Sequence, residues 1–226
     1  MDESVPSYDS KVLRKAFTLL ELLMTIGVLV TLLISIGSIL RRDISHKQLS
    51  MALMKVKNFL SLAVTIARLD HLYVRILWDD AEASSTHVHR IFLLTSTRID
   101  PSAEWILMRS EDLPEHCWWM THCDEKEYFS GEIVNVSETW LYGTSVALDT
   151  GNIPVREWVL EPSEMLRDMA GNRPSYRSMG IGYGKSLSHV EENIHRSPVG
   201  CILVNANGNI RTYEGIDAIQ EMLATL

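Results

Sequence analysis

The stretch Phe17–Glu21, with the sequence FTLLE, opens an apolar segment that continues to Leu40. Between Phe17 and Leu40 the only ionisable side chain is that of Glu21. A membrane-spanning helix needs about 20 consecutive, mostly apolar residues, and this segment meets that length. A charged group at the centre of such a helix costs about 2.5–3.5 kcal/mol, so Glu21 is expected to have a function.

This stretch resembles the signature of the type IV pilin superfamily, which includes the pseudopilins of type II secretion. In that superfamily a short charged leader precedes a prepilin-peptidase cut, and Phe-Thr-Leu-x-Glu then opens a long apolar helix. Phe17–Glu21 fits this pattern position by position, and Lys11, Arg14 and Lys15 provide the basic end of the leader. One position departs from the pattern: Ala16 stands before the expected cut, where the superfamily nearly always has glycine.

The resemblance implies roles for three residues. Prepilin peptidase would cut between Ala16 and Phe17, and the new amine of Phe17 would be methylated. Glu21 lies one helical turn later and would pair with the Phe17 amine of its own or a neighbouring subunit during assembly. The implied protein is a minor pilin or pseudopilin, a non-enzymatic structural subunit of a type IV pilus or a type II secretion pseudopilus.

The resemblance also implies a location and partners. The subunit would cross the bacterial inner membrane once, with its globular domain outside the cytoplasm, before entering a periplasmic or surface filament. Its partners would be prepilin peptidase, other pilin or pseudopilin subunits, an inner-membrane assembly platform and, before assembly, membrane lipid. Charge counting does not orient the helix by itself, because Arg41, Arg42 and Lys47 follow the apolar segment as three basic residues precede it.

Two other kinds of N-terminal segment could also begin with a long apolar run. A secretory signal has an apolar core of about 7–15 residues that ends at a small-residue cut. This segment is longer, and Ile39–Arg42 offers no such cut. The alternative that stays open is a single-span, membrane-anchored binding module outside the cytoplasm that does not polymerise. Retention of the leader would favour that alternative.

The helix is expected to continue beyond the membrane segment. Apolar residues recur at steps of three and four, which indicates an amphipathic helix: Leu49, Ala52, Leu53, Val56, Leu60, Ala63, Val64 and Ala67. No proline or glycine interrupts residues 41–70, so we predict one helix from Thr18 to Leu69. The predicted regions are a leader (1–16), a membrane or filament-core helix (17–42), its amphipathic continuation (43–70) and a β-rich globular domain (71–226).

Short runs of branched and aromatic residues predict strands after residue 70. These runs are Leu72–Trp78, Val88–Thr95, Trp105–Met108, Trp140–Leu148, Val155–Leu160, Cys201–Asn205 and Ile210–Tyr213. Asn207-Gly208 predicts a tight hairpin in which both residues take positive φ. Ser163–Ala170 and the segment from Ile216 to Leu223 predict helices. The expected class is α+β, with the long helix packed on the β-rich domain, and this order resembles the GspH/FimT type of minor pseudopilin.

Three readings stay open for the segment His116–Cys123, with the sequence HCWWMTHC. Cys117 and Cys123 could form a disulfide outside the cytoplasm. Two His-Cys pairs could also bind zinc through His116, Cys117, His122 and Cys123, although the spacing fits zinc motifs poorly. In the third reading both thiols are free and Trp118 and Trp119 cover the core. The remaining cysteine, Cys201, is expected to be a small core residue.

Composition and motifs argue against several functions. The 226 residues carry a net charge of −8, which argues against nucleic acid as a partner. The nearest candidate for a basic strip consists of Arg167, Arg173, Arg177, Lys185 and Arg196. Met179–Ser186 ends like a phosphate-binding loop but lacks its first glycine, so its glycines are expected to make turns. No complete catalytic constellation is visible, so we expect no enzymatic activity and no cofactor.

Overall fold

The computed structural model describes residues 18–79, 90–99, 104–120, 122–123, 126–127, 132–136, 145–146, 153–162, 166 and 174–225. The chain divides into two compact units, Met1–Asp43 and Ile44–Leu226. Helix α1 (Leu19–Leu69) has 51 residues and contributes to both units. The prediction of one continuous helix from Thr18 to Leu69 is therefore confirmed to within one residue.

The second unit combines the end of α1 with antiparallel β-structure, so the predicted α+β class is confirmed. Its strands are β1 (Tyr73–Asp79), β2 (Arg90–Ser96), β3 (Trp105–Asp112), β4 (Cys117–Met120), β5 (His122–Cys123), β6 (Lys126–Glu127), β7 (Glu132–Val136), β8 (Ser145–Val146), β9 (Ile153–Leu160), β10 (Tyr176–Tyr183), β11 (Val199–Asn205) and β12 (Ile210–Glu214). Two shorter helices are α2 (Leu187–Glu192) and α3 (Ile216–Ala224).

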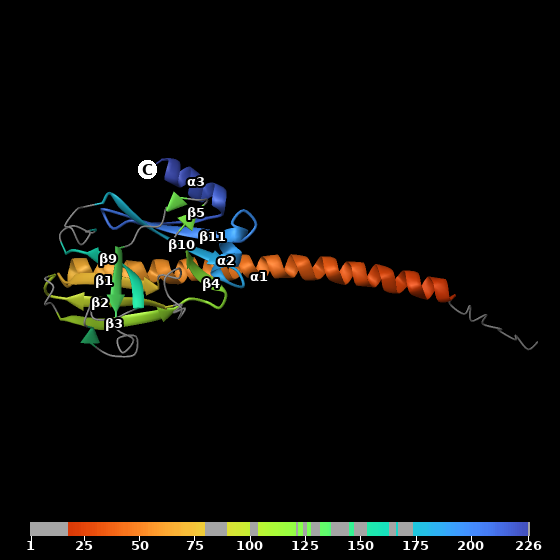
Figure 1. Cartoon of the computed structure of the whole chain (residues 1–226), viewed down its shortest axis with the longest axis horizontal. Coiled ribbons are helices and arrows are strands. Elements are labelled where there is room, and N and C mark those ends of the chain that lie inside the picture. Colours follow the sequence, from red (N-terminus) through yellow and green to blue (C-terminus); the bar gives the residue numbers. More distant parts are fainter. Residues whose placement is uncertain are drawn as a thin grey trace, which may run out of the picture. The chain divides into compact units, whose positions relative to one another are not determined.

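The strands form two main sheets. The larger sheet has the order β7-β9-β1-β2-β3-β8, and the smaller sheet has the order β12-β11-β10-β4. All pairings within them are antiparallel, and β5 and β6 form a separate pair. In Figure 1 the second half of α1 lies between strands β1–β3 and strands β10–β11, and α3 lies beyond the smaller sheet.

The main core lies where α1 meets the inner faces of both sheets. Every residue of the predicted apolar stripe of α1 is at most 8% exposed, and Phe59, which the stripe omitted, is buried with them. Three tryptophans connect the sheets within this core. The ring centroids of Trp78 and Trp158 in the larger sheet are 5.1 Å apart, and Trp78 is 6.4 Å from Trp119 in the smaller sheet. The helix therefore supplies one wall of a core that the sheets share.

A second core covers the opposite face of the smaller sheet. Its members include Met120 and Cys201 from the sheet, Val190 from α2, and Ile219 and Met222 from α3. The predicted terminal amphipathic helix is thus confirmed as α3, with Ile219 and Met222 as its buried residues. Because side chains alternate along a strand, the smaller sheet is apolar on both faces.

The strand predictions missed β4, β5, β6, β7 and β10, and of these strands only β10 contains glycine. β1, β2, β3, β9, β11 and β12 each overlap a predicted strand. The expectation that the glycines of Met179–Ser186 make turns is wrong for Gly180 and Gly182, which lie inside β10 and pair with β11 and β4. An ideal Cβ on Gly182 would be 2.4 Å from Val190 Cγ1, so close packing explains this glycine.

Two predicted elements fall mostly outside the described residues. The helix expected at Ser163–Ala170 lies there except for Leu166, which is buried. The strand expected at Trp140–Leu148 is described only at Ser145–Val146, as β8.

The predicted hairpin between β11 and β12 is present, but its turn differs from the expected type. Gly208 has φ 72°, whereas Asn207 does not have positive φ. The Gly208 N–H donates to the Asn205 carbonyl at 2.8 Å, and the Asn205 N–H donates to the Asn209 carbonyl at 3.1 Å. These bonds indicate a type I turn followed by glycine in the left-handed region, which is the common three-residue hairpin loop.

The contact between Gly200 and Leu53 tests how tightly α1 packs on the smaller sheet. An ideal Cβ on Gly200 would lie 2.5 Å from Leu53 Cδ1, and Leu53 is 1% exposed. We predict that Gly200→Ala lowers the free energy of unfolding by about 1–3 kcal/mol, the usual range for overpacking.

Leu53→Ala alone should cost about 2–5 kcal/mol through the cavity it leaves. The double variant should cost less than the sum, because the new methyl group enters that cavity. Gly27→Ala is the matched control, since nothing lies within 4 Å of its Cβ position. Chemical denaturation of the unmodified chain, the two single variants and the double variant measures these costs. If the two single costs simply add in the double variant, the close contact is contradicted.

Candidate functional site

The first candidate site is the apolar half of α1. Leu19–Gly37 comprises 19 residues with a mean hydropathy of 2.5, and none of it is buried. By length and composition this helix is suited to span a membrane. Asp43–Leu69 is also long and apolar enough to span a membrane, but 44% of it is buried. The buried stripe of that second segment belongs to the main core, which explains its apolar character without a membrane.

The few polar side chains of the apolar half are bonded within the helix. Thr25 Oγ1 donates to the Leu22 carbonyl at 2.8 Å, and Thr31 Oγ1 donates to the Val28 carbonyl at 2.8 Å. Ser35 Oγ donates to the Thr31 carbonyl at 2.9 Å. Hydroxyl groups satisfied in this way do not need water, so they are compatible with an apolar environment.

Glu21 takes part in a capping box at the start of α1. Its carboxylate Oε2 accepts from the Thr18 N–H at 3.0 Å and from Thr18 Oγ1 at 3.1 Å. In return, Thr18 Oγ1 accepts from the Glu21 N–H at 3.2 Å. A Thr three residues before a Glu is the usual sequence of this motif, and it satisfies backbone donors that the first helical turn leaves open. This capping role was not predicted above, although the Thr18-x-x-Glu21 spacing is its signal in the sequence.

The capping box gives Glu21 a function within its own chain. The carboxylate also lies in the first turn of α1, where the helix dipole favours negative charge. The predicted processing residues Ala16 and Phe17 lie outside the described residues. The pairing of Glu21 with a Phe17 amine therefore stays a prediction, and the capping box is a second explanation for the same carboxylate.

Cys117 has a free thiol inside the main core. It is 0% exposed, and its Sγ donates weakly to the carbonyl of Gln48 in α1 at 3.9 Å. Burial raises the pKa of the Cys117 thiol to about 12. Because the thiolate is the form that binds zinc and attacks disulfides, this environment disfavours both reactions. Cys201 is fully buried, as expected, but in the second core.

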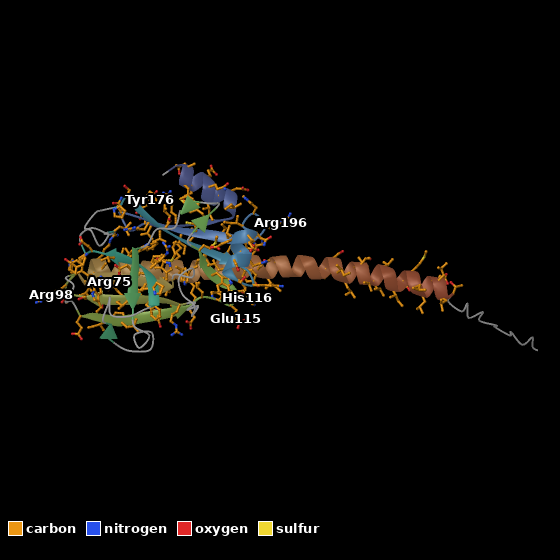
Figure 2. All side chains as sticks on the ribbon, viewed as in Figure 1. Arg75, Arg98, Glu115, His116, Tyr176 and Arg196 are labelled. Atoms are coloured by element: carbon orange, nitrogen blue, oxygen red, sulfur yellow. The ribbon has the colours of Figure 1, made fainter. Side chains whose placement is uncertain are left out.

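His116 faces a different environment from its neighbour Cys117. It is exposed, has φ 64°, and its ring centroid is 6.0 Å from that of Tyr183. Its carbonyl accepts from the Gly184 N–H at 2.9 Å, so the residue fixes the turn between β3 and β4 against β10. Figure 2 labels His116 and its neighbour Glu115.

The structure therefore does not bring the predicted cysteine and histidine ligands together as far as it describes them. No group of three or more His, Cys, Asp or Glu side chains suited to a metal ion occurs among the described residues. The side chains of His122 and Cys123 are outside that description, so a disulfide to Cys123 stays a prediction. Trp119 is buried in the main core and Trp118 packs against the second, as the third reading expected.

The predicted basic strip is only partly described. Lys185 and Arg196 are exposed in the segments before and after α2, and Figure 2 labels Arg196. Arg177 is half-buried within β10, and Arg167 and Arg173 lie outside the described residues. The three described members do not share one element or one degree of exposure, so they offer no continuous basic face for a phosphate backbone.

The larger sheet contains a buried ion pair that no local sequence motif indicates. Arg75 Nε lies 3.1 Å from Glu157 Oε2, and the two side chains are 5% and 1% exposed. The Arg75 guanidinium also lies 4.4 Å from the centre of the Trp105 ring, a cation–π distance. Figure 2 labels Arg75. Side chains this deeply buried do not meet a ligand from solvent, and we interpret the trio as structural.

The rate at which Cys117 is alkylated tests whether its thiol is free and buried. In the native protein at pH 7–8, we predict that Cys117 resists alkylation, because its raised pKa leaves almost no thiolate. Urea should expose it to rapid labelling, which mass spectrometry of the peptides detects. The stability that the buried neutral thiol contributes should be lost as pH rises from about 8.5, the ordinary thiol pKa, towards 12.

Non-reducing peptide mapping provides the opposing outcomes for the same residue. A peptide joining Cys117 to Cys123 would contradict the free thiol. Release of zinc on acidification would support the metal-binding reading. Labelling of Cys117 in the native protein at the rate seen in urea would show that the core is open at β4.

Comparisons with known proteins add no family to these observations. No protein-family model, no curated protein and no solved structure matches this chain. A functional assignment therefore depends on the residues themselves, above all on Glu21 and the apolar half of α1.

Proposed function

We propose that this chain is a minor pilin or pseudopilin, a structural subunit that is stored in a membrane and assembled through the apolar half of α1. The observation that supports this proposal best is the state of Leu19–Gly37. It is a regular helix, strongly apolar and 0% buried, with Glu21 as its single ionisable residue. Such a surface needs an apolar partner, which lipid supplies before assembly and neighbouring helices supply afterwards.

The second half of α1 supports the same proposal. From Leu49 to Ala67 one face of the helix is buried against both sheets of the globular unit. One helix thus supplies an apolar surface at one end and a domain core at the other. This arrangement suits a subunit in which the helix assembles and the globular unit contacts other subunits, cargo or a surface.

The capping box refines how Glu21 would act in assembly. The Thr18 N–H and hydroxyl already bind one carboxylate oxygen, Oε2. Among the described residues only Oε2 of this carboxylate accepts a hydrogen bond, and a carboxylate has about four acceptor sites, so Glu21 retains capacity to accept from the Phe17 amine of a neighbouring subunit. In an apolar helix bundle, removal of either member would leave a costly unpaired charge.

The alternative candidate is a single-span anchored module that binds a partner without polymerising. The long apolar helix and the globular unit suit that function equally well. The two candidates differ in the fate of the leader and in the contacts between copies. They are separated by the two experiments below.

The first experiment follows processing of the leader. We predict that prepilin peptidase cuts between Ala16 and Phe17, so that the mature chain lacks its first sixteen residues and carries a methylated amine. Ala16→Gly should be processed at least as well, whereas Ala16→Leu should block the cut through its bulk. Intact-mass measurement of membrane-extracted protein gives the result. A mature chain that begins at Met1 would favour the anchored module.

The second experiment separates the two roles of Glu21. Glu21→Gln removes the charge, but a Gln at this position still completes a capping box. Thr18→Ala removes the capping hydroxyl and keeps the carboxylate, at a cost of about 0.5–2 kcal/mol in helix stability. If charge pairing drives assembly, Glu21→Gln should abolish cross-linked subunit contacts while Thr18→Ala keeps them.

The same pair of variants has a clear opposite outcome. If Glu21 acts only as a helix cap, Glu21→Gln assembles normally and Thr18→Ala is the weaker variant. Membrane levels of both proteins, measured in parallel, control for insertion. Insertion should not suffer in Glu21→Gln, because the substitution removes a charge from an apolar segment.

A further inference from the structure

The turn between β11 and β12 joins the chemistry of an Asn-Gly pair to a contact with α1. Asn207 is exposed, and Gly208, at φ 72°, has no Cβ that would shield its amide nitrogen. The Arg68 guanidinium, in the last turn of α1, donates to the Asn207 carbonyl. This carbonyl belongs to the peptide bond whose nitrogen is that of Gly208.

We propose that Asn207 is a deamidation site whose rate is set by the contact between Arg68 and the turn. In the reaction, the Gly208 nitrogen loses its proton and attacks Asn207 Cγ, forming a C–N bond and a five-membered imide. The carboxamide nitrogen leaves as ammonia with that proton. Water then opens the imide at either carbonyl and yields aspartate or isoaspartate. The balance is one water consumed and one ammonia released.

The closed turn opposes the first step. The Gly208 N–H is donated to the Asn205 carbonyl at 2.8 Å, so the attacking nitrogen is engaged in a hydrogen bond. Asn207 is in the third position of this type I turn, where ψ is near 0°. This ψ holds the Gly208 nitrogen away from Asn207 Cγ. The reaction therefore requires local opening of the turn, and such opening costs least at exposed loop tips.

Arg68 adds to the cost of opening because it fixes the same peptide from the side of α1. Loss of one hydrogen bond of this kind changes an opening equilibrium by about two- to tenfold. Arg68 thus links the chemical lifetime of Asn207 to the docking of the helix end on the hairpin. Deamidation marks molecules in which that end of α1 has been released.

Other asparagines of the chain are internal comparisons. Asn205 Oδ1 accepts from the N–H groups of Asn207 and Asn209 at 3.1 and 2.9 Å, so its side chain is held in the turn. Asn193 Nδ2 donates to the His189 carbonyl at 3.0 Å. Neither is followed by glycine, and the next residue's side chain hinders attack by its nitrogen. Both should stay intact while Asn207 converts.

The test is a time course on the full chain in detergent at mildly alkaline pH. Peptide mapping measures deamidation at each asparagine, and an isoaspartate-specific methyltransferase confirms the product. Arg68→Met should convert at Asn207 about two- to tenfold faster than the unmodified chain. Arg211→Met is the matched control, because it removes an exposed arginine from β12 without removing the bond to Asn207.

A parallel time course in urea decides the remaining outcomes. Equal rates for the native chain and Arg68→Met would overturn the proposal, as would conversion of Asn205 as fast as Asn207. In urea the chain with Arg68 and the Arg68→Met variant should convert Asn207 at the same rate. That rate should be higher than the rate of either protein without urea. If Arg68→Met is faster in urea as well, the effect is local chemistry and control by the fold is refuted.

Discussion

The burial of one face of α1 between two sheets is the interaction on which the globular unit depends. Neither sheet has a complete inner core without it, because Trp78 and Trp158 on one side and Trp119 on the other meet beside the helix. Small residues let the backbones approach closely: Ala63 and Ala67 are 0% exposed, and Gly200 leaves space for a leucine of α1. Docking of the helix therefore completes the core of the globular unit.

Much of this fold could be predicted from the sequence because its strongest signals are periodic. The stripe from Leu49 to Ala67 has the helical period, and every residue in it is buried. One of the missed strands, β10, contains Gly180 and Gly182, and close packing against Val190 rather than a turn explains the glycine at 182. The order of strands within each sheet depends on long-range pairing, which local sequence patterns do not encode.

The candidate sites were predictable in proportion to how local their chemistry is. Glu21 stands out as the single carboxylate of an apolar segment, and its capping partner Thr18 was also readable three residues earlier. The cysteine segment left three interpretations open in the sequence, because side chains that are adjacent along a strand point to opposite faces of the sheet. Cys117 and Trp119 point into the main core, and Trp118 and Met120 point to the other face of the smaller sheet.

Three hydrogen bonds that join α1 to the rest of the globular unit have a mechanical consequence. Ser50 donates to Glu214 at 2.6 Å, Lys55 donates to the Asp112 carbonyl at 2.7 Å, and Arg68 donates to the Asn207 carbonyl. These bonds are spread over about five turns of one helix. A force along the helix axis would act on all three hydrogen bonds at the same time. It would also act on the buried side chains between them. Pulling sideways at one end would break them in succession, so the unit should resist axial force best.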